Sequence, residues 1–173
     1  MKNIATLIHE NGRQITLVMA LFALGLGLFA VTLANLLRLD ACHLCIFQRL
    51  AFFVIGALLI FAFFGWENLI LRRVLLGIAS ACCGWCMNVA AQQSWLQWFP
   101  ESGLTCTIVE PGVTERLIDW LGQIYPLFFM ATGSCESKDL VVFGLSLANW
   151  SFLVLLIFLA ANMCLLAKGK KAL

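Results

Sequence analysis

Two cysteines separated by two residues, Cys42 and Cys45, form the part of this sequence best suited to chemistry. Their spacing allows an intramolecular disulfide, and such motifs often contain a cysteine that ionises readily. Arg49 follows Cys45 by four residues, so in a helix that begins near Cys45 the guanidinium and the sulfur share one face. A helix N-terminus also favours an anion. We therefore predict a thiolate at Cys45 supported by Arg49; the alternative for Arg49 is a side chain that only snorkels to the membrane surface.

The other six cysteines fall into two groups. Cys106 and Cys135 lie in a long polar connection, whereas the rest lie inside apolar runs: Cys82, Cys83, Cys86 and Cys164. Cys83 and Cys86 form a second Cys-x-x-Cys motif, but a thiolate inside an apolar run would be badly desolvated. We expect the cysteines of the apolar runs to pack as small hydrophobic side chains.

Cysteines in polar segments serve three other purposes in proteins. Covalent haem attachment requires a histidine directly after the second cysteine, and Ile46 stands there instead. A four-thiolate zinc site would need the second pair to have a short spacing, but Cys106 and Cys135 are 29 residues apart. Two purely structural disulfides remain an alternative, because Cys106 and Cys135 could simply staple the long connection.

The composition indicates the kind of scaffold that must position these residues. Of the 173 residues, 62% are hydrophobic and 12% are charged, with a mean hydropathy of +0.97. A soluble domain is about 45–50% apolar and about 25% charged, so a soluble globular domain and a disordered chain are both excluded. The net charge of +2 gives no reason to expect nucleic-acid binding. We predict an integral membrane protein.

Four apolar runs predict the spans of an all-α four-helix membrane bundle that forms one domain over residues 1–173. The expected spans cover approximately 15–37, 46–64, 74–95 and 144–167. Runs of this length cross ~30 Å of hydrocarbon as helices. The first run is longer than the roughly 7–15 apolar residues of a signal peptide, so we expect it to be retained.

The charges predict the orientation of the bundle. The N-terminal segment, the 65–73 connection and the C-terminal tail together carry a net charge of +5, and the remaining residues carry −3. The positive-inside rule then places both termini in the cytoplasm and the 38–45 and 96–143 loops in the outer compartment, which in a bacterium is the periplasm. Cys42, Cys45, Cys106 and Cys135 would all face this oxidising side, where disulfides persist.

The long 96–143 loop contains one regular pattern. Apolar residues recur at helical spacing between 113 and 124, with charged residues between them. This pattern predicts a short horizontal amphipathic helix in the membrane surface. The alternative is an ordinary loop helix packed on the bundle.

Taken together, these segments resemble the DsbB family (disulfide bond formation protein B), bacterial inner-membrane oxidases that recharge a soluble periplasmic thiol oxidase. The resemblance covers most of the chain. It rests on four spans, a Cys-x-x-Cys-x-x-x-Arg pattern at the start of the second span and three loop segments: Leu96-Gln97-Trp98-Phe99-Pro100, Thr105-Cys106 and Ala131-Thr132-Gly133-Ser134-Cys135.

The resemblance implies a relay of two redox-active disulfides. Cys106 and Cys135 would form the pair that accepts electrons from a DsbA-like periplasmic partner, whose thiolate attacks Cys106. Cys135 would then attack Cys42 in the second pair. Cys45 would face a non-covalently bound ubiquinone or menaquinone from the membrane pool, and Arg49 would help to hold both the thiolate and the quinone. The chain would thus be a protein-disulfide:quinone oxidoreductase that sustains disulfide bond formation.

Two glutamines depart from the family pattern. Gln93 stands where a histidine near the quinone is found, and we take it as a quinone-binding candidate. Gln48 replaces an acidic residue often found before the arginine, which predicts a stronger pull of Arg49 on a Cys45 thiolate. The alternative functions are a paralogue that serves a different dithiol partner and a non-catalytic membrane scaffold with two structural disulfides.

Overall fold

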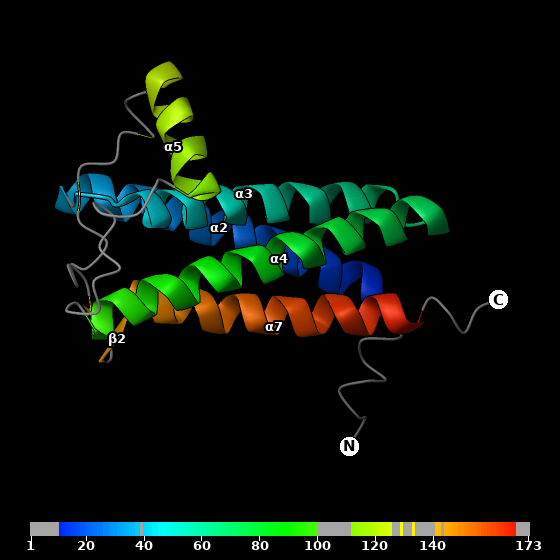
Figure 1. Cartoon of the computed structure of the whole chain (residues 1–173). Coiled ribbons are helices and arrows are strands. Elements are labelled where there is room, and N and C mark those ends of the chain that lie inside the picture. The colour runs from blue at the N-terminus through cyan, green and yellow to red at the C-terminus, as the bar shows by residue number, and fades with distance from the viewer. Residues whose placement is uncertain are drawn as a thin grey trace.

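The protein is a bundle of long apolar helices, seen here in a computed structural model that describes residues 11–38, 40–99, 112–125, 129, 133, 141–142 and 144–168. Its four long helices are α2 (Gly12–Leu37), α3 (His43–Phe64), α4 (Leu69–Trp98) and α7 (Leu147–Lys168). All four are long and apolar enough to cross a membrane. They run side by side in Figure 1, which confirms the predicted all-α four-helix membrane bundle.

Local chemistry fixes where the helices begin and end. Helix α2 ends at Arg38, which has a left-handed backbone (φ 49°) and donates its N–H to the carbonyl of Ala34. Helix α4 begins after Asn68, whose side-chain oxygen accepts hydrogen bonds from the backbone N–H groups of Ile70 and Leu71. Helix α3 begins after Cys42, whose sulfur accepts the Cys45 N–H at 3.4 Å. The second span therefore starts within the Cys-x-x-Cys motif.

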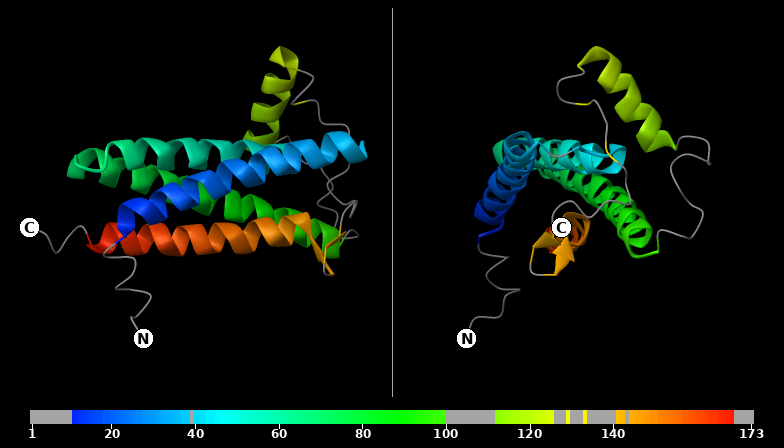
Figure 2. Two further views of the ribbon diagram at one scale, coloured as in Figure 1. Left: turned by 180° about the vertical axis from the view of Figure 1, so that it is seen from behind. Right: turned by 90° about the vertical axis from the view of Figure 1, so that its left-hand side faces the viewer.

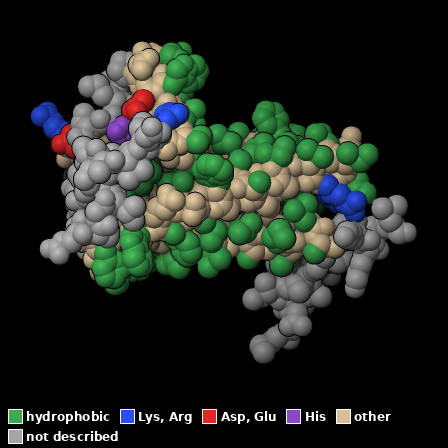
Figure 3. All heavy atoms as spheres, in the orientation of Figure 1, with side chains coloured by type: hydrophobic (Ala, Val, Ile, Leu, Met, Phe, Trp, Pro, Cys, Tyr) green, Lys and Arg blue, Asp and Glu red, His purple; other side chains and the backbone are tan. Residues whose placement is uncertain are grey.

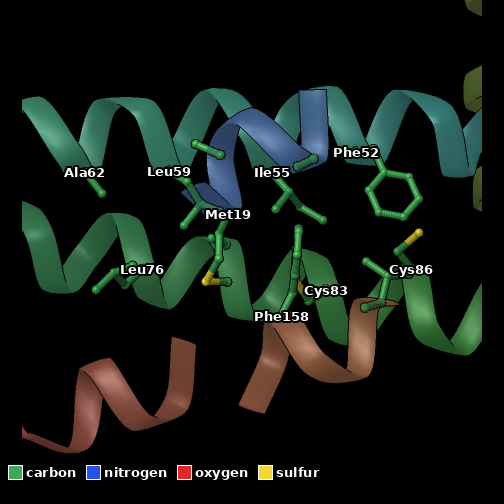
Figure 4. Close-up of a cluster of buried hydrophobic side chains, with 13 residues drawn as sticks. Met19, Phe52, Ile55, Leu59, Ala62, Leu76, Cys83, Cys86 and Phe158 are labelled. Carbon is green, nitrogen blue, oxygen red and sulfur yellow. The ribbon is translucent and has the colours of Figure 1, made fainter. Parts of the chain in front are cut away.

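The core lies between neighbouring helices, in the order α2, α3, α4 and α7. Figure 4 shows the side chains that fill it, including Ile55 and Leu59 of α3 and Phe158 of α7. Cys83 and Cys86 are fully buried in this cluster, as the apolar-packing interpretation predicts. Cys164, which was also expected to pack, is exposed on the outside of α7.

The bundle has two chemically different ends. At one end Gly12, Trp66 and Leu165 lie together, so the start of α2, the α3–α4 turn and the end of α7 meet. At the opposite end are the start of α3, helix α5 (Val113–Ile124) and a short hairpin. Figure 3 shows hydrophobic side chains along the middle of the bundle and charged side chains towards its ends.

Helix α5 crosses the direction of the four long helices and stands out from them (Figures 1 and 2). Its Ile118 is fully buried where the helix packs on α3, whereas Val113, Trp120 and Ile124 are exposed. Glu115 accepts the backbone N–H of Gly112 at 2.9 Å and so stabilises the first turn. The predicted amphipathic helix is therefore present, set across the spans as a helix in the membrane surface would be.

A small antiparallel hairpin precedes α7. Strand β1 (Val141–Val142) pairs with β2 (Leu145–Ser146), and Gly144 makes the turn with a φ of +80°. The apolar run from residue 144 was expected to be one uninterrupted span, but α7 begins only at Leu147. Hydropathy alone does not distinguish these strand residues from helix, since both are apolar.

Candidate functional site: a cysteine pair at one end of the bundle

The two cysteines of the motif lie against each other at the start of α3. Their sulfur atoms are 2.9 Å apart, in direct contact. Cys42 is buried (2% exposed), whereas Cys45 is only partly buried. The pair is therefore close enough to form a disulfide after a small movement, and Cys45 is the more accessible of its two sulfurs.

The surroundings of the pair are mainly apolar. Cys42 packs with Leu44 of α3 and with Val89 and Leu96 of α4. This small cluster is separate from the main core and lies between the start of α3 and the last turns of α4. Polar contacts to the sulfurs therefore act where little water competes with them.

One side chain of α4 donates to both sulfurs. The amide nitrogen of Gln93 lies 2.9 Å from Cys45 Sγ and 3.6 Å from Cys42 Sγ. The Gln93 amide oxygen in turn accepts a 2.8 Å hydrogen bond from the amide nitrogen of Gln48 on α3. Both glutamines are buried, with 5% of Gln48 and 3% of Gln93 exposed. The two departures from the family pattern thus form one hydrogen-bonded unit beside the cysteines.

Arg49 occupies the next turn of α3 after Cys45 and is partly buried. Its charge interacts with both Cys45 and Cys42. Arg49 follows Cys45 by four residues in this helix, the i,i+4 spacing at which two side chains share one side. A positive charge at this position favours a thiolate over a neutral thiol.

A further contact joins the motif to α5. His43, between the two cysteines, lies with its Nε2 atom 2.8 Å from Asp119 Oδ1. The two residues are 76 positions apart, so no spacing pattern could have joined them.

The long connection approaches the motif through Gly133. The Gly133 N–H donates to the carbonyl of Ala41 at 3.2 Å, immediately before Cys42. A Cβ atom at position 133 would collide with the carbonyl oxygen of Asp40, so the contact requires glycine. This contact was not anticipated, although Gly133 lies in a segment that carries the family resemblance.

Two of the four predicted redox cysteines, Cys106 and Cys135, lie outside the described residues. Gly133, however, is two positions from Cys135 and touches the residue next to Cys42.

A cavity of about 350 Å³ lies on another face of α4. Its lining is largely aromatic and comes from the end of α4 and the start of α7, including Trp95, Trp98 and Phe152. Neither cysteine of the motif, nor Arg49 or Gln93, lines it. The cavity is therefore separate from the cysteine pair.

Comparison with known proteins gives consistent matches. The family model described as "Disulfide bond formation protein DsbB" matches residues 12–165. The chain is 42% identical to Disulfide bond formation protein B of Dechloromonas aromatica (strain RCB) over 139 residues, covering 79% of this chain and 81% of the relative. The protein of the same name from Nitrosomonas europaea is 32% identical over 146 residues, covering 84% and 88%.

A third relative, Disulfide bond formation protein B of Albidiferax ferrireducens, is 30% identical over 148 residues, covering 85% of this chain and 83% of its own length. The family match includes all four long helices and the Cys-x-x-Cys motif with its arginine. On these matches, and on the cysteine pair built into the start of its second span, the chain belongs to the DsbB family.

Proposed function

We propose that this protein is a protein-disulfide:quinone oxidoreductase that oxidises a DsbA-like dithiol protein and passes the electrons to a membrane quinone. Family membership supports a role in disulfide bond formation. The observation that carries the proposal is the placement of Cys42 and Cys45, 2.9 Å apart at the mouth of an apolar helix, with hydrogen-bond donors aimed at the sulfurs. A purely structural cysteine pair has no need of such donors.

The proposed relay begins at the long loop. The partner's thiolate attacks Cys106, the Cys106–Cys135 disulfide breaks, and Cys135 leaves as a thiolate. The partner's second thiol then displaces Cys106, which leaves the partner oxidised and this loop pair reduced. Two electrons have thereby entered the chain for each disulfide made in the partner.

The second exchange joins the two pairs. Cys135 attacks Cys42 of the Cys42–Cys45 disulfide, and Cys45 leaves as a thiolate. Cys106 then displaces Cys42 from Cys135, which restores the loop disulfide and leaves Cys42 and Cys45 reduced. The contact between Gly133 and Ala41 supports this order, because it brings the chain near Cys135 to the residue beside Cys42.

The residues around Cys45 fit a quinone headgroup. Arg49 and the Gln93 amide are donors suited to a quinone's carbonyl oxygens, and the surrounding helix faces are apolar. A bound ubiquinone or menaquinone would supply a two-electron, two-proton acceptor. Cys45 would present its sulfur to it, because Cys45 is the partly exposed member of the pair. Arg49 and Gln93 would orient the headgroup and hold the sulfur in its thiolate form.

The proposal also assigns a location. Disulfide exchange with a DsbA-like partner requires the cysteine end of the bundle to face a bacterial periplasm, which places both termini on the cytoplasmic side of the inner membrane. Among the described residues, Arg13, Arg72 and Arg73 lie at the end opposite the cysteines, and the positive-inside rule supports this orientation.

The test is anaerobic mixing of the purified full chain with a reduced DsbA-like protein and a soluble quinone analogue, following quinone absorbance. We expect rapid quinone reduction that is abolished by Cys45→Ser and, separately, by Cys106→Ser. Cys164→Ser is the matched control, because this exposed cysteine lies on α7 and should leave the rate unchanged.

The outcomes separate the alternatives. No reduction of ubiquinone or menaquinone analogues by any dithiol would contradict the proposal and favour the structural-disulfide scaffold. Reduction that is driven by a small dithiol but not by the DsbA-like protein would retain the enzyme and assign it a different partner.

A further inference from the structure

The donor to the redox cysteines is itself held by a second buried side chain. Gln93 can present either end of its amide, and only its NH₂ end can donate to a sulfur. Gln48 settles the choice, because its own NH₂ group donates to Gln93 Oε1 at 2.8 Å. With its oxygen so occupied, Gln93 directs its nitrogen at Cys45 Sγ. Gln48 on α3 therefore donates to Gln93 on α4, and Gln93 donates back to Cys45 on α3.

Both glutamines are more than nine-tenths buried, and a buried amide without partners is costly. Among the described residues, the Gln48 amide donates to Gln93 Oε1, whereas the amide that donates to the two sulfurs is that of Gln93. Any influence of Gln48 on the cysteines would therefore pass through Gln93. The geometry makes Gln93 the contacting residue and Gln48 the residue that sets its orientation.

The two glutamine donors, Gln48 and Gln93, differ from Arg49 because their amides carry no charge. Among the described residues near Cys45, the ionisable groups of α3 and its N-cap are Cys42, His43 and Arg49, and α5 contributes Asp119, which is hydrogen-bonded to His43. Gln93 supplies the contact from α4 as a neutral amide, which keeps its two protons throughout the physiological pH range. Its donation to sulfur is therefore constant with pH.

We propose that Gln48 is a positioning residue of the redox site: it fixes the Gln93 amide with its NH₂ group against Cys45 Sγ, and the pair stabilises the Cys45 thiolate. A role for this thiolate presupposes the proposed function. The test does not, because thiolate formation can be measured without partner or quinone.

The experiment uses the reduced, quinone-free full chain in detergent. Iodoacetamide alkylation is followed across pH, and Cys45 is distinguished from Cys42 by fragment-ion mass spectrometry. We expect Gln93→Leu to move the midpoint of Cys45 alkylation up by about one pH unit, which is about ten times less thiolate at a given pH. Gln48→Leu should move it in the same direction by a smaller amount.

Combining Gln48 variants with Gln93→Leu distinguishes a positioning role of Gln48 from a general role in packing. Gln48→Glu nearly preserves shape, but its carboxylate only accepts hydrogen bonds, so it should turn the Gln93 amide and raise the midpoint. If Gln48 acts through Gln93, neither Gln48→Leu nor Gln48→Glu should raise the midpoint further in a Gln93→Leu background. Gln92→Leu is the matched control, because Gln92 is an exposed neighbour on the same helix and should leave the midpoint unchanged.

An unchanged midpoint in Gln93→Leu would overturn the proposal. So would a Gln48→Glu effect that persists undiminished in the Gln93→Leu background, since the charge would then act directly on the sulfur. Failure of the wild-type chain to reduce quinone would refute the proposed function alone, because the alkylation profile would still report whether the glutamines hold a thiolate.

Discussion

At the scale of single residues, Cys42 and Cys45 have different surroundings although they belong to one motif. Cys42 caps α3 with its sulfur and is buried among apolar side chains. Cys45 lies one turn into the helix, is partly exposed, and receives the shorter of the two Gln93 contacts. This asymmetry suits a pair in which one sulfur exchanges with another disulfide and the other meets a lipid-soluble acceptor.

We expect Arg49 both to stabilise the Cys45 thiolate and to bind the quinone. Replacing Arg49 by alanine removes the positive charge one turn from the sulfur, so thiolate formation should fall and the KM for quinone should rise about tenfold, which corresponds to ~1.4 kcal/mol. Arg49→Lys should be intermediate, because lysine keeps the charge and loses the planar fork of donors. Quinone titration and the pH profile of Cys45 alkylation measure the two effects.

Arg38→Ala is the control for Arg49, since Arg38 is a basic residue at the same end of the bundle, at the close of α2. It should change neither quantity. If Arg49→Ala behaves like Arg38→Ala, the arginine only snorkels to the membrane surface and has no part in the chemistry.

At the scale of elements, three separate segments converge on the start of α3. Helix α4 supplies Gln93, α5 supplies Asp119 to His43, and the chain at Gly133 binds the Ala41 carbonyl. The Cys-x-x-Cys turn is therefore held from several sides, while the sulfurs remain in contact with each other. Such support keeps a reactive pair in a narrow range of geometries.

Gly133→Ala is expected to separate the two steps of the relay. The added Cβ would collide with the Asp40 carbonyl, so the long connection should lose its contact with the residues before Cys42. Oxidation of the DsbA-like partner should slow roughly 10- to 100-fold, the loss typical of a misplaced reacting group. Quinone reduction driven by a small dithiol acting directly on Cys42 and Cys45 should be retained. Stopped-flow absorbance measures both reactions.

Gly112→Ala provides the matched control in the same connection, because an added Cβ there would meet only Thr114 Oγ1 at 3.9 Å. It should leave both reactions close to wild type. A Gly133→Ala variant that oxidises the partner at the normal rate would show that this contact has no role in the transfer between the pairs.

At the scale of the whole molecule, the bundle separates its cysteine end from the end where α2 begins and α7 stops. Between these ends the helices pack closely. A Cβ at Gly56 would come within 2.6 Å of the Leu24 side chain, so α2 and α3 approach closely at this glycine. The cysteine site thus sits at one end of a closely packed apolar bundle.

The orientation can be tested with a membrane-impermeant maleimide in intact cells, using a chain whose native cysteines are replaced by serine. Gly112→Cys, beside α5, should be labelled directly. Glu67→Cys, in the exposed turn at the opposite end, should be labelled only after the membrane is permeabilised. The reverse labelling pattern would place the cysteine end in the cytoplasm and contradict the proposed location.

The sequence by itself determined the features that depend on local order. Four apolar runs suffice to predict four membrane helices, since a spanning segment must satisfy its own backbone hydrogen bonds. The period of the 113–124 segment suffices to predict α5. The spacing of Cys42, Cys45 and Arg49 suffices to predict that these residues lie together, because they fall within the first two turns of one helix.

Only the tertiary structure decided which distant residues meet this group. Gln93 reaches the sulfurs from 48 positions away, and Gln48 becomes informative only once α3 and α4 are packed together. Asp119 and Gly133 reach the motif from still farther along the chain. Hydropathy and helical period describe each segment alone, whereas these contacts depend on how whole helices approach and turn towards one another, which is set by packing across the bundle.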